Sequence, residues 1–246
     1  MNDFYIVAKE PGAENPAIPT WANDSTNPAQ LSLRPPLIKR HEVESVPGSF
    51  QLLNVLSNTE CENLIKMSES LGYHSDAAVS LPRTIRHNFN VTWVTDELTP
   101  AILWNRCESL IRLEDQSLEN IFSVGLNARF RFYRYQVGDY FGPHTDGAWP
   151  GSKVIDRKLI SNAFTDRYSR LSFIIFLSDG FSGGRTEFFT KTGDDKKISV
   201  TTPKGGVLCF PHGAHPLHCV HSSETIANGT KYIIRTDVLF TNRTGL

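Results

Sequence analysis

The sequence predicts a mainly β protein with flanking α-helices, in which a β-sandwich or jelly roll carries helices packed on one sheet. From residue 127 onward, short apolar segments alternate with Gly- and Pro-containing turns, and NARFRFYRYQV has the two-residue period of a strand. Before that point, two segments have the 3.6-residue spacing of amphipathic helices. Helices followed by many short strands are typical of this fold class.

The composition excludes several classes of protein. The chain has 246 residues, 39% hydrophobic content and a formal net charge of −1, so it carries no long-range attraction for nucleic acid or anionic lipid. Its longest apolar stretch, LSFIIFL at 171–177, is too short to span a bilayer, and the N-terminus has no secretory pattern. Four scattered cysteines indicate a reducing compartment. We therefore expect a cytoplasmic protein without nucleic-acid or membrane partners.

The first part of the chain differs from the rest. Seven of the 14 prolines precede residue 48, which predicts an extended Pro-rich N-terminal arm over residues 1–45 that could mediate association. Residues 46–246 are expected to form a single domain, with a helical support region at 46–125 and a jelly-roll core at 126–243. The sequence does not predict the oligomeric state.

Two helices are expected in the support region. Ser57 and Glu60 form a capping-box pattern at the start of the first helix, and Gly72 is a natural stop. The second helix is expected to begin at Thr99 as N-cap, with Pro100 in its first turn.

The strands expected in the core are RFRFYRY, LSFIIFL, TEFFT, KISVT, GVLCF and KYIIRTDVLF. Between the first two lies a segment at 147–169 that is longer than a usual loop, and its position favours a mobile lid.

The segment GPHTDG contains the clearest metal-binding pattern. His144 and Asp146 are separated by one residue, so at the end of a strand both side chains point to the same face. One distant histidine would complete a two-histidine, one-carboxylate site for a divalent first-row metal. The candidates for that ligand lie in PHGAHPLHCVH: His212, His215, His218 and His221.

A lysine downstream of the histidine cluster favours one of these candidates. His221 is followed ten residues later by Lys231, which opens the last strand. A cation at that place suits an iron oxygenase whose cosubstrate, 2-oxoglutarate, needs a partner for its far carboxylate. The other three histidines are interpreted as structural, because their spacing suits a single tetrahedral site poorly.

At these residues the sequence resembles the Fe(II)/2-oxoglutarate-dependent dioxygenases of the prolyl 4-hydroxylase type. The resemblance runs from about Asn127 to Thr241, through YRYQVGDYFGPHTDG, LSFIIFLSDGFSGGRTEFF, PKGGVLCFPHGAHPLHCVH and NGTKYIIRTDV. It implies a double-stranded β-helix, the cupin-like jelly roll. It also implies Fe(II), 2-oxoglutarate and O2, with ascorbate as a candidate reductant, and release of succinate and CO2 as a C–H bond is hydroxylated.

The resemblance also implies roles for particular residues. It makes His144, Asp146 and His221 the iron ligands, and Lys231 the partner of the 2-oxoglutarate 5-carboxylate. Arg235, four residues along the same strand, is a second candidate for that carboxylate or for the substrate. Further cosubstrate contacts are expected from Tyr135 and Thr186.

The sequence departs from the prolyl hydroxylase pattern at two positions. Phe141 stands three residues before His144 where tyrosine is usual, and Tyr232 stands where tryptophan is usual. These departures argue against a collagen-type substrate and leave the iron chemistry intact.

The substrate is expected to be an amino acid, a carboxylated metabolite or a peptidyl group. Residues 126–170 contain eight Lys or Arg against four Asp or Glu, which a negatively charged substrate would use. The candidate substrate contacts are Arg129, Arg131 and Arg86. The alternatives are a peptidyl prolyl 4-hydroxylase proper, a zinc hydrolase, and a non-catalytic cupin-like metal-binding protein.

Overall fold

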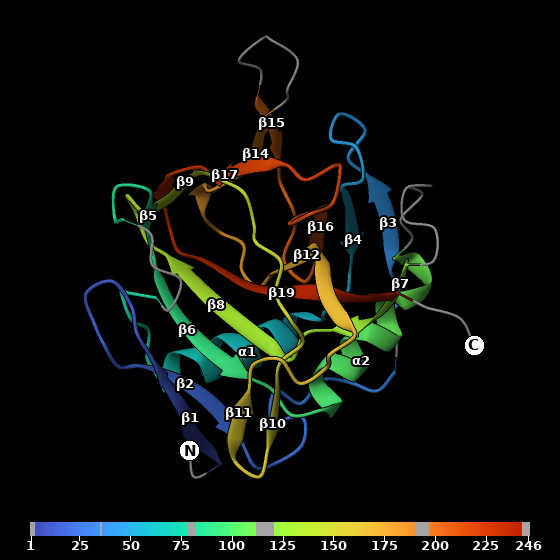
Figure 1. Ribbon diagram of the computed structural model, residues 1–246. Coiled ribbons are helices and arrows are strands. Elements are labelled where there is room, and N and C mark those ends of the chain that lie inside the picture. The colour runs from blue at the N-terminus through green and yellow to red at the C-terminus, as the bar shows by residue number, and fades with distance from the viewer. Residues whose placement is uncertain (1–2, 35, 78–81, 112–120, 190–196, 243–246) are drawn as a thin grey trace.

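The computed structural model describes residues 3–34, 36–77, 82–111, 121–189 and 197–242. A large sheet and a smaller sheet make up most of the molecule (Figure 1). The strands of the large sheet are β1 (Phe4–Glu10), β2 (Ile18–Asn23), β3 (Lys39–Glu42), β4 (Phe50–Leu53), β6 (Phe89–Val94), β7 (Ile121–Leu126), β8 (Arg129–Tyr135), β12 (Arg167–Phe176), β16 (Val207–Pro211) and β19 (Lys231–Asn242). Their order is β1-β2-β6-β8-β19-β12-β16-β4-β3, and β7 also pairs with β19.

The smaller sheet has the order β15-β14-β17-β9-β5. Its strands are β5 (Arg86–His87), β9 (Tyr140–His144), β14 (Thr186–Phe189), β15 (Lys197–Val200) and β17 (Val220–Ser223). Two short pairs complete the strands: β10 (Lys153–Ile155) with β11 (Lys158–Ile160), and β13 (Ser182–Gly183) with β18 (Ile226–Asn228). Crossovers between non-consecutive antiparallel strands give the jelly roll that the sequence predicts.

The alternation of β8 divides the interior into two apolar clusters. Phe130 and Phe132 point to one face, where they pack with Trp93 and with apolar residues of both helices. Tyr133 and Tyr135 point to the opposite face, into a second cluster that contains residues of both sheets. β8 thus presents its phenylalanines to the helices and its tyrosines to the space between the two sheets.

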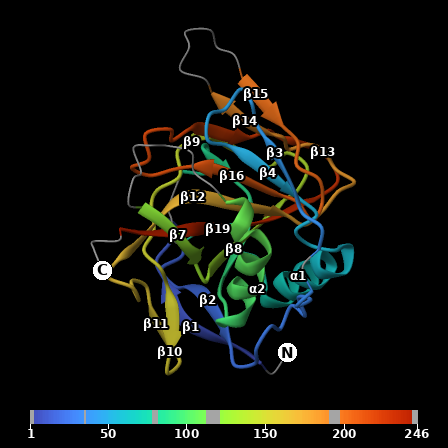
Figure 2. The same cartoon turned by 90° about the vertical axis from the view of Figure 1, so that its right-hand side faces the viewer.

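The two helices are α1 (Asn58–Leu71) and α2 (Leu98–Cys107), followed by a 3-10 turn at Glu108–Leu110. Both lie below β19, at the opposite end of the molecule from β14 and β15 (Figures 1 and 2). The capping box is confirmed, because Ser57 Oγ accepts from the Glu60 amide while the Glu60 carboxylate accepts from the Ser57 amide. Gly72 follows α1 at φ 88°, a conformation that favours glycine.

The expected start of the second helix is wrong by two residues, because the N-cap position is Glu97 and not Thr99. The helix begins at Leu98, and the Asp96 carboxylate accepts from the amides of Leu98 and Thr99. Thr99 is buried, and its hydroxyl donates to Asp96. A carboxylate at this place satisfies two free helical N–H groups, so it replaces the expected threonine cap.

The expectation of an extended arm is wrong for the strands at the N-terminus. β1 pairs with β2, and β2 pairs in parallel with β6 of the large sheet. Farther along, Ala29 and Leu31 are buried in the same cluster as the helices. The region 46–125 is likewise not only helical, because it supplies β4, β6 and most of β7. Pro19 even lies within β2, opposite Lys9 of β1, so the prolines do not exclude this segment from the fold.

The segment at 147–169 contains the β10–β11 hairpin, which lies beside β1 at the lower edge of the molecule (Figure 1). Arg157 in the hairpin turn forms an ion pair with Asp24 and lies over the Tyr5 ring. The hairpin therefore packs against the N-terminal strands, and a mobile lid formed by residues 147–169 stays a prediction. No helix among the described residues has the length and apolar character that a bilayer crossing requires.

Candidate active site

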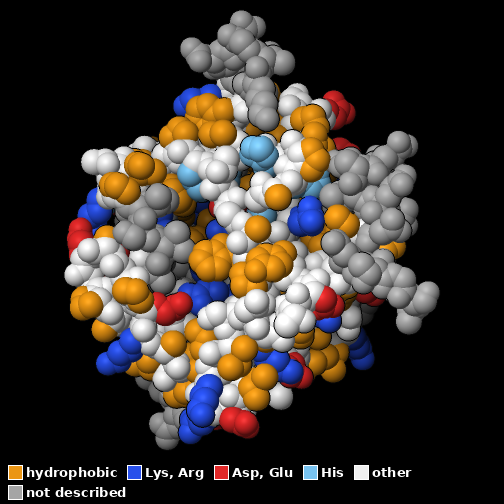
Figure 3. Space-filling view, in the orientation of Figure 1, with side chains coloured by type: hydrophobic (Ala, Val, Ile, Leu, Met, Phe, Trp, Pro, Cys, Tyr) orange, Lys and Arg blue, Asp and Glu red, His pale blue; other side chains and the backbone are white. Residues whose placement is uncertain are grey.

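A cavity of about 160 Å³ lies between the two sheets. Its walls come from β8, β12 and β19 of the large sheet and from β9, β14 and β17 of the smaller one. Histidine side chains gather on the upper half of the face shown in Figure 3, and two of the eight, His144 and His221, line this cavity. Most of the sequence-predicted site residues therefore meet at one place.

The two histidines are held opposite each other by strand pairing. His144 ends β9, His221 lies on β17, and the two residues are direct partners in the ladder. Asp146 follows two residues after His144, and its carboxylate oxygens lie 3.8 Å from Nε2 of His144 and 3.8 Å from Nε2 of His221. One ligand atom from each residue lies within 4.8 Å of the others. The structure thus brings together the three residues expected to be metal ligands.

Hydrogen bonds and burial leave these residues in the protonation states that a metal requires. Nδ1 of His144 donates to the carbonyl of Gly142 at 2.8 Å, so Nε2 keeps its lone pair. Burial lowers the pKa of both imidazoles, that of His221 to about 4. Burial alone would raise the pKa of Asp146, but Arg235 and the histidines hold it well below its usual range. Two neutral imidazoles and one carboxylate fit a divalent first-row metal.

A buried hydrogen-bond chain holds Asp146 in place. Ser172 Oγ on β12 donates to the Asp146 carboxylate at 2.6 Å. His212 Nδ1 lies 2.7 Å from Ser172 Oγ, and His212 Nε2 lies 2.8 Å from Ser169 Oγ. Because Ser172 uses its proton on Asp146, the His212 Nδ1–H donates to Ser172. Sequence reasoning missed Ser172, a polar residue that shares one face of β12 with the apolar Ile174 and Phe176.

Lys231 is the first residue of β19 and lines the cavity at the opposite end from Arg235, which is four residues farther along the same strand. Its side chain is 1% exposed, and Nζ donates to the Gly184 carbonyl at 2.6 Å and to Ser223 Oγ at 3.0 Å. Gly184 has φ +67°, and a Cβ there would lie 3.2 Å from Lys231 Cδ, so the glycine allows this close approach. Among the described residues no carboxylate lies within ion-pair distance of Nζ, and burial lowers the lysine pKa to about 7. This ammonium is a buried cation without a counter-ion.

Arg235 contrasts with Lys231 because its charge is matched. Its Nε lies 3.3 Å from Asp146, and its Nη2 lies 3.1 Å from Asp237. Asp237 is fully buried. The two carboxylates raise the arginine pKa against the effect of burial. Arg235 therefore helps to hold Asp146.

Four further residues expected at the site line the cavity: Tyr135 and Thr186, expected to contact the cosubstrate, and Arg86 and Arg131, expected to contact the substrate. Tyr135 and Thr186 are buried and line the cavity, and Lys231 Nζ lies 5.2 Å from the centre of the Tyr135 ring. Burial raises the pKa of the Tyr135 hydroxyl, which therefore stays protonated. Arg86 and Arg131 also line the cavity.

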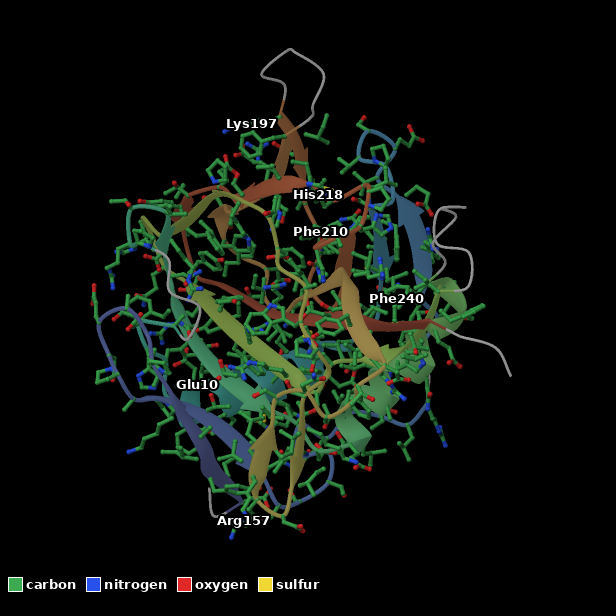
Figure 4. The ribbon with its side chains drawn as sticks, viewed as in Figure 1. Glu10, Arg157, Lys197, Phe210, His218 and Phe240 are labelled. Atoms are coloured by element: carbon green, nitrogen blue, oxygen red, sulfur yellow. The ribbon has the colours of Figure 1, made fainter. Side chains whose placement is uncertain are left out.

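Arg129, the third arginine considered for the substrate, is not brought to the cavity. Its guanidinium forms an ion pair with Glu10 of β1, a residue labelled in Figure 4. Strand alternation alone predicts that Arg129 and Arg131 share a face. The ion pair with the N-terminal strand instead holds Arg129 away from the cavity.

Phe141, one of the two departures from the family pattern, lies next to the triad. The Phe141 ring stacks on the His144 ring, with centroids 3.6 Å apart, so it orients the imidazole by packing. The neighbouring Tyr140 donates to the Thr84 carbonyl at 3.2 Å and does not line the cavity. Phe210 packs beside His221 with ring centroids 4.5 Å apart, and His218 lies farther from the triad in the loop before β17 (Figure 4).

Comparison with known proteins agrees with this site. Residues 130–236 match the family model described as the 2OG-Fe(II) oxygenase superfamily. A search of curated protein sequences found no match.

Solved structures share the fold. A prolyl-4-hydroxylase from Pseudomonas putida aligns with a TM-score of 0.53 and 15% identity, over 81% of this chain and 95% of that one. A prolyl hydroxylase from Trichoplax adhaerens, solved with a hypoxia-inducible-factor peptide fragment, aligns with a TM-score of 0.55 and 15% identity, over 80% and 85% of the two chains. The family match over residues 130–236 supports an iron(II)- and 2-oxoglutarate-dependent oxygenase, and the solved structures show that the chain has the fold of the prolyl hydroxylases.

Proposed function

We propose that His144, Asp146 and His221 hold Fe(II), and that Lys231 binds the 5-carboxylate of 2-oxoglutarate. The observation that carries this proposal is the buried Lys231 ammonium, which faces the same cavity as the triad and has no carboxylate partner among the described residues. A buried unpaired charge is costly, and a carboxylate ligand would offset that cost.

Arg235 is assigned a different role. Its guanidinium is engaged by Asp146 and Asp237, so it orients the carboxylate ligand of the metal and leaves the cosubstrate to Lys231. Of the two candidates for the 5-carboxylate, only Lys231 would gain a missing counter-ion.

When bound, Fe(II) and 2-oxoglutarate supply the oxidising chemistry, in which O2 is consumed, succinate and CO2 are released and a substrate C–H bond is hydroxylated. The chain's own residues prepare the site for it. Tyr135 has a protonated hydroxyl at the cavity wall and is placed to donate to the cosubstrate, and Thr186 lines the wall beside it. Phe141 and Phe210 shield the histidine rings from water.

The substrate is proposed to be an amino acid, a carboxylated metabolite or a peptidyl group. The arginines that line the cavity support an anionic molecule. The peptide bound to the Trichoplax enzyme supports a peptidyl substrate, and a prolyl 4-hydroxylase proper stays the alternative. The buried cysteines Cys61, Cys107 and Cys209 are free thiols, which supports a cytoplasmic location.

The test is succinate formation from 2-oxoglutarate by the Fe(II)-loaded protein, measured for the wild type, Asp146→Ala and Lys231→Ala. We expect both variants to lose turnover, Asp146→Ala through metal binding and Lys231→Ala through a raised KM for 2-oxoglutarate. Lys197→Ala is the matched control, because this half-exposed lysine of β15 pairs with Glu187 outside the cavity. Wild-type KM for 2-oxoglutarate in Lys231→Ala would overturn the lysine assignment, and succinate formation by none of the proteins would overturn the function.

A further inference from the structure

We infer that Arg131 forms a binding site for a carboxylate of the substrate, across the cavity from Lys231. This inference rests on the proposed function and deepens it, because it names the chemical group that the substrate must carry. It assigns Arg131 to the substrate, Lys231 to the cosubstrate and Arg235 to the metal ligand Asp146.

The first argument is that the two terminal nitrogens of Arg131 are buried without hydrogen bonds to the described residues. The residue is 5% exposed, it lines the cavity, and neither of its terminal nitrogens has a hydrogen-bond partner among the described residues. The closest carboxylate oxygen belongs to Asp237 and lies 3.7 Å from Nη1, beyond hydrogen-bond distance. Buried donors are nearly always satisfied in native proteins, so these nitrogens point to a ligand.

The second argument is that Asp237 is shared and cannot satisfy both arginines. Its Oδ1 lies 3.1 Å from Arg235 Nη2, while its Oδ2 is the oxygen near Arg131. Burial and the neighbouring Arg235 together lower the pKa of Arg131 to about 10, while Asp237 opposes this shift. The guanidinium is still protonated at neutral pH, so one positive charge lacks a full partner.

The third argument is the charge of the loaded cavity. Four cations and two carboxylates meet there among the described residues: Arg86, Arg131, Lys231, Arg235, Asp146 and Asp237. The charges of Fe(II) and of the 2-oxoglutarate dianion cancel, and the histidines are neutral. The loaded cavity therefore keeps two positive charges, which an anionic substrate would neutralise.

The fourth argument is the fixed orientation of the guanidinium. Arg131 lies over the Trp149 ring, 4.3 Å from its centroid, and projects from the rigid central strand β8. A planar fork held in one orientation matches a planar carboxylate through two parallel hydrogen bonds. Arg86 lies 5.4 Å from the Tyr133 ring centroid at the half-buried rim of the same cavity, where it adds to the attraction.

The substrate carboxylate can belong to a free acid or to a peptide, and the test has an arm for each. Protein loaded with Mn(II) and 2-oxoglutarate is titrated calorimetrically with the N-acetyl-L-amino acids whose side chains are uncharged and with the corresponding neutral N-acetyl amides. The peptide arm uses hexapeptides with amidated ends that carry one glutamate or one glutamine. We expect at least one carboxylate to bind about 10- to 100-fold more tightly than its neutral counterpart, as a charge-assisted bond predicts.

Variants then assign this preference to one side chain. Arg131→Met should reduce the ratio between acid and amide affinities to about one, and Arg131→Lys should restore part of it because lysine keeps the charge. Arg134→Met is the matched control, because Arg134 lies on the same strand, faces the other way and pairs with Glu69. Circular dichroism checks that each variant is folded.

Three outcomes would overturn the inference. They are equal affinity for all acids and amides in the wild type, an acid preference that survives in Arg131→Met, and a tenfold loss of 2-oxoglutarate affinity in Arg131→Met, which would assign the arginine to the cosubstrate. Succinate formation measured on the same wild-type preparation separates the two proposals. If it is present while the acid preference is absent, the function holds and only the inference fails.

Discussion

Binding of 2-oxoglutarate to Lys231 must be coupled to uptake of a proton at alkaline pH, because a carboxylate pairs only with the protonated amine. Burial lowers the pKa of this lysine from 10.5 to about 7 in the ligand-free protein. Above pH 7 the side chain is therefore mostly neutral before the ligand arrives. The dissociation constant should rise by about tenfold per pH unit from about pH 7 to pH 9.

The size of the effect follows from the environment of the lysine. The difference between a pKa of 10.5 and one of about 7 is worth about 5 kcal/mol, which is an upper bound for what a bound carboxylate recovers. Other groups of the site do not titrate in this window. The pKa values of His144 and His221 are lowered, and that of Asp146 lies far below neutrality.

Isothermal titration calorimetry of the Mn(II)-loaded protein at pH 7, 8 and 9 measures this directly. Titrations in Hepes and in Tris, which differ in ionisation enthalpy, count the protons taken up and should give close to one per ligand at pH 9. Lys231→Arg is the control, because its guanidinium stays charged and its affinity should not change with pH. A constant wild-type dissociation constant without proton uptake would refute the assignment of Lys231.

Three further predictions follow from buried polar groups. Lys231→Met should raise the free energy of unfolding of the ligand-free protein by about 2 kcal/mol at pH 7 in urea denaturation. The lysine pKa is lower in the folded than in the unfolded protein, so wild-type stability rises between pH 7 and 10.5 and the gain should shrink toward pH 10. A gain that does not change with pH would contradict the buried lysine charge as its cause. Ser172→Ala should weaken metal binding by about 10- to 100-fold in competition with a chelator, because Asp146 loses its 2.6 Å hydrogen bond, and unchanged affinity would show that this bond is dispensable. Glu10→Gln should lower the free energy of unfolding by about 3 kcal/mol, since it leaves Arg129 buried without a counter-ion, and a loss below about 0.5 kcal/mol would contradict that ion pair.

The sequence predicts those features that depend on a few neighbouring residues. The capping box at Ser57 is a local pattern, and the structure contains it. The alternation in β8 places Phe130 and Phe132 on one face and Tyr133 and Tyr135 on the other, as expected. The fold class is confirmed for the same reason, because it follows from the period and length of the segments.

Features that depend on distant partners could not be predicted in this way. Arg129 and Arg131 share a face by alternation, yet Glu10 of β1 engages only the first of them. No local pattern indicates that pairing, because β1 reaches β8 through β2 and β6. The bond from Ser172 to Asp146 likewise joins β12 of the large sheet to the loop that follows β9 of the smaller sheet, so it becomes visible only when both are placed.

Strand β19 carries both Lys231 and Arg235, and its ladder pairs Lys231 with Tyr135 and Arg235 with Arg131. Four residues of a strand span about 13 Å, so the backbone itself sets the spacing between the cosubstrate end and the arginine end of the cavity. With a substrate carboxylate bound at Arg131, the regiochemistry of hydroxylation would be a matter of molecular length. The carbon oxidised would be the one that reaches the metal from a fixed anchor, so lengthening a substrate by one methylene at its far end would leave oxidation at the same number of carbons from the carboxylate.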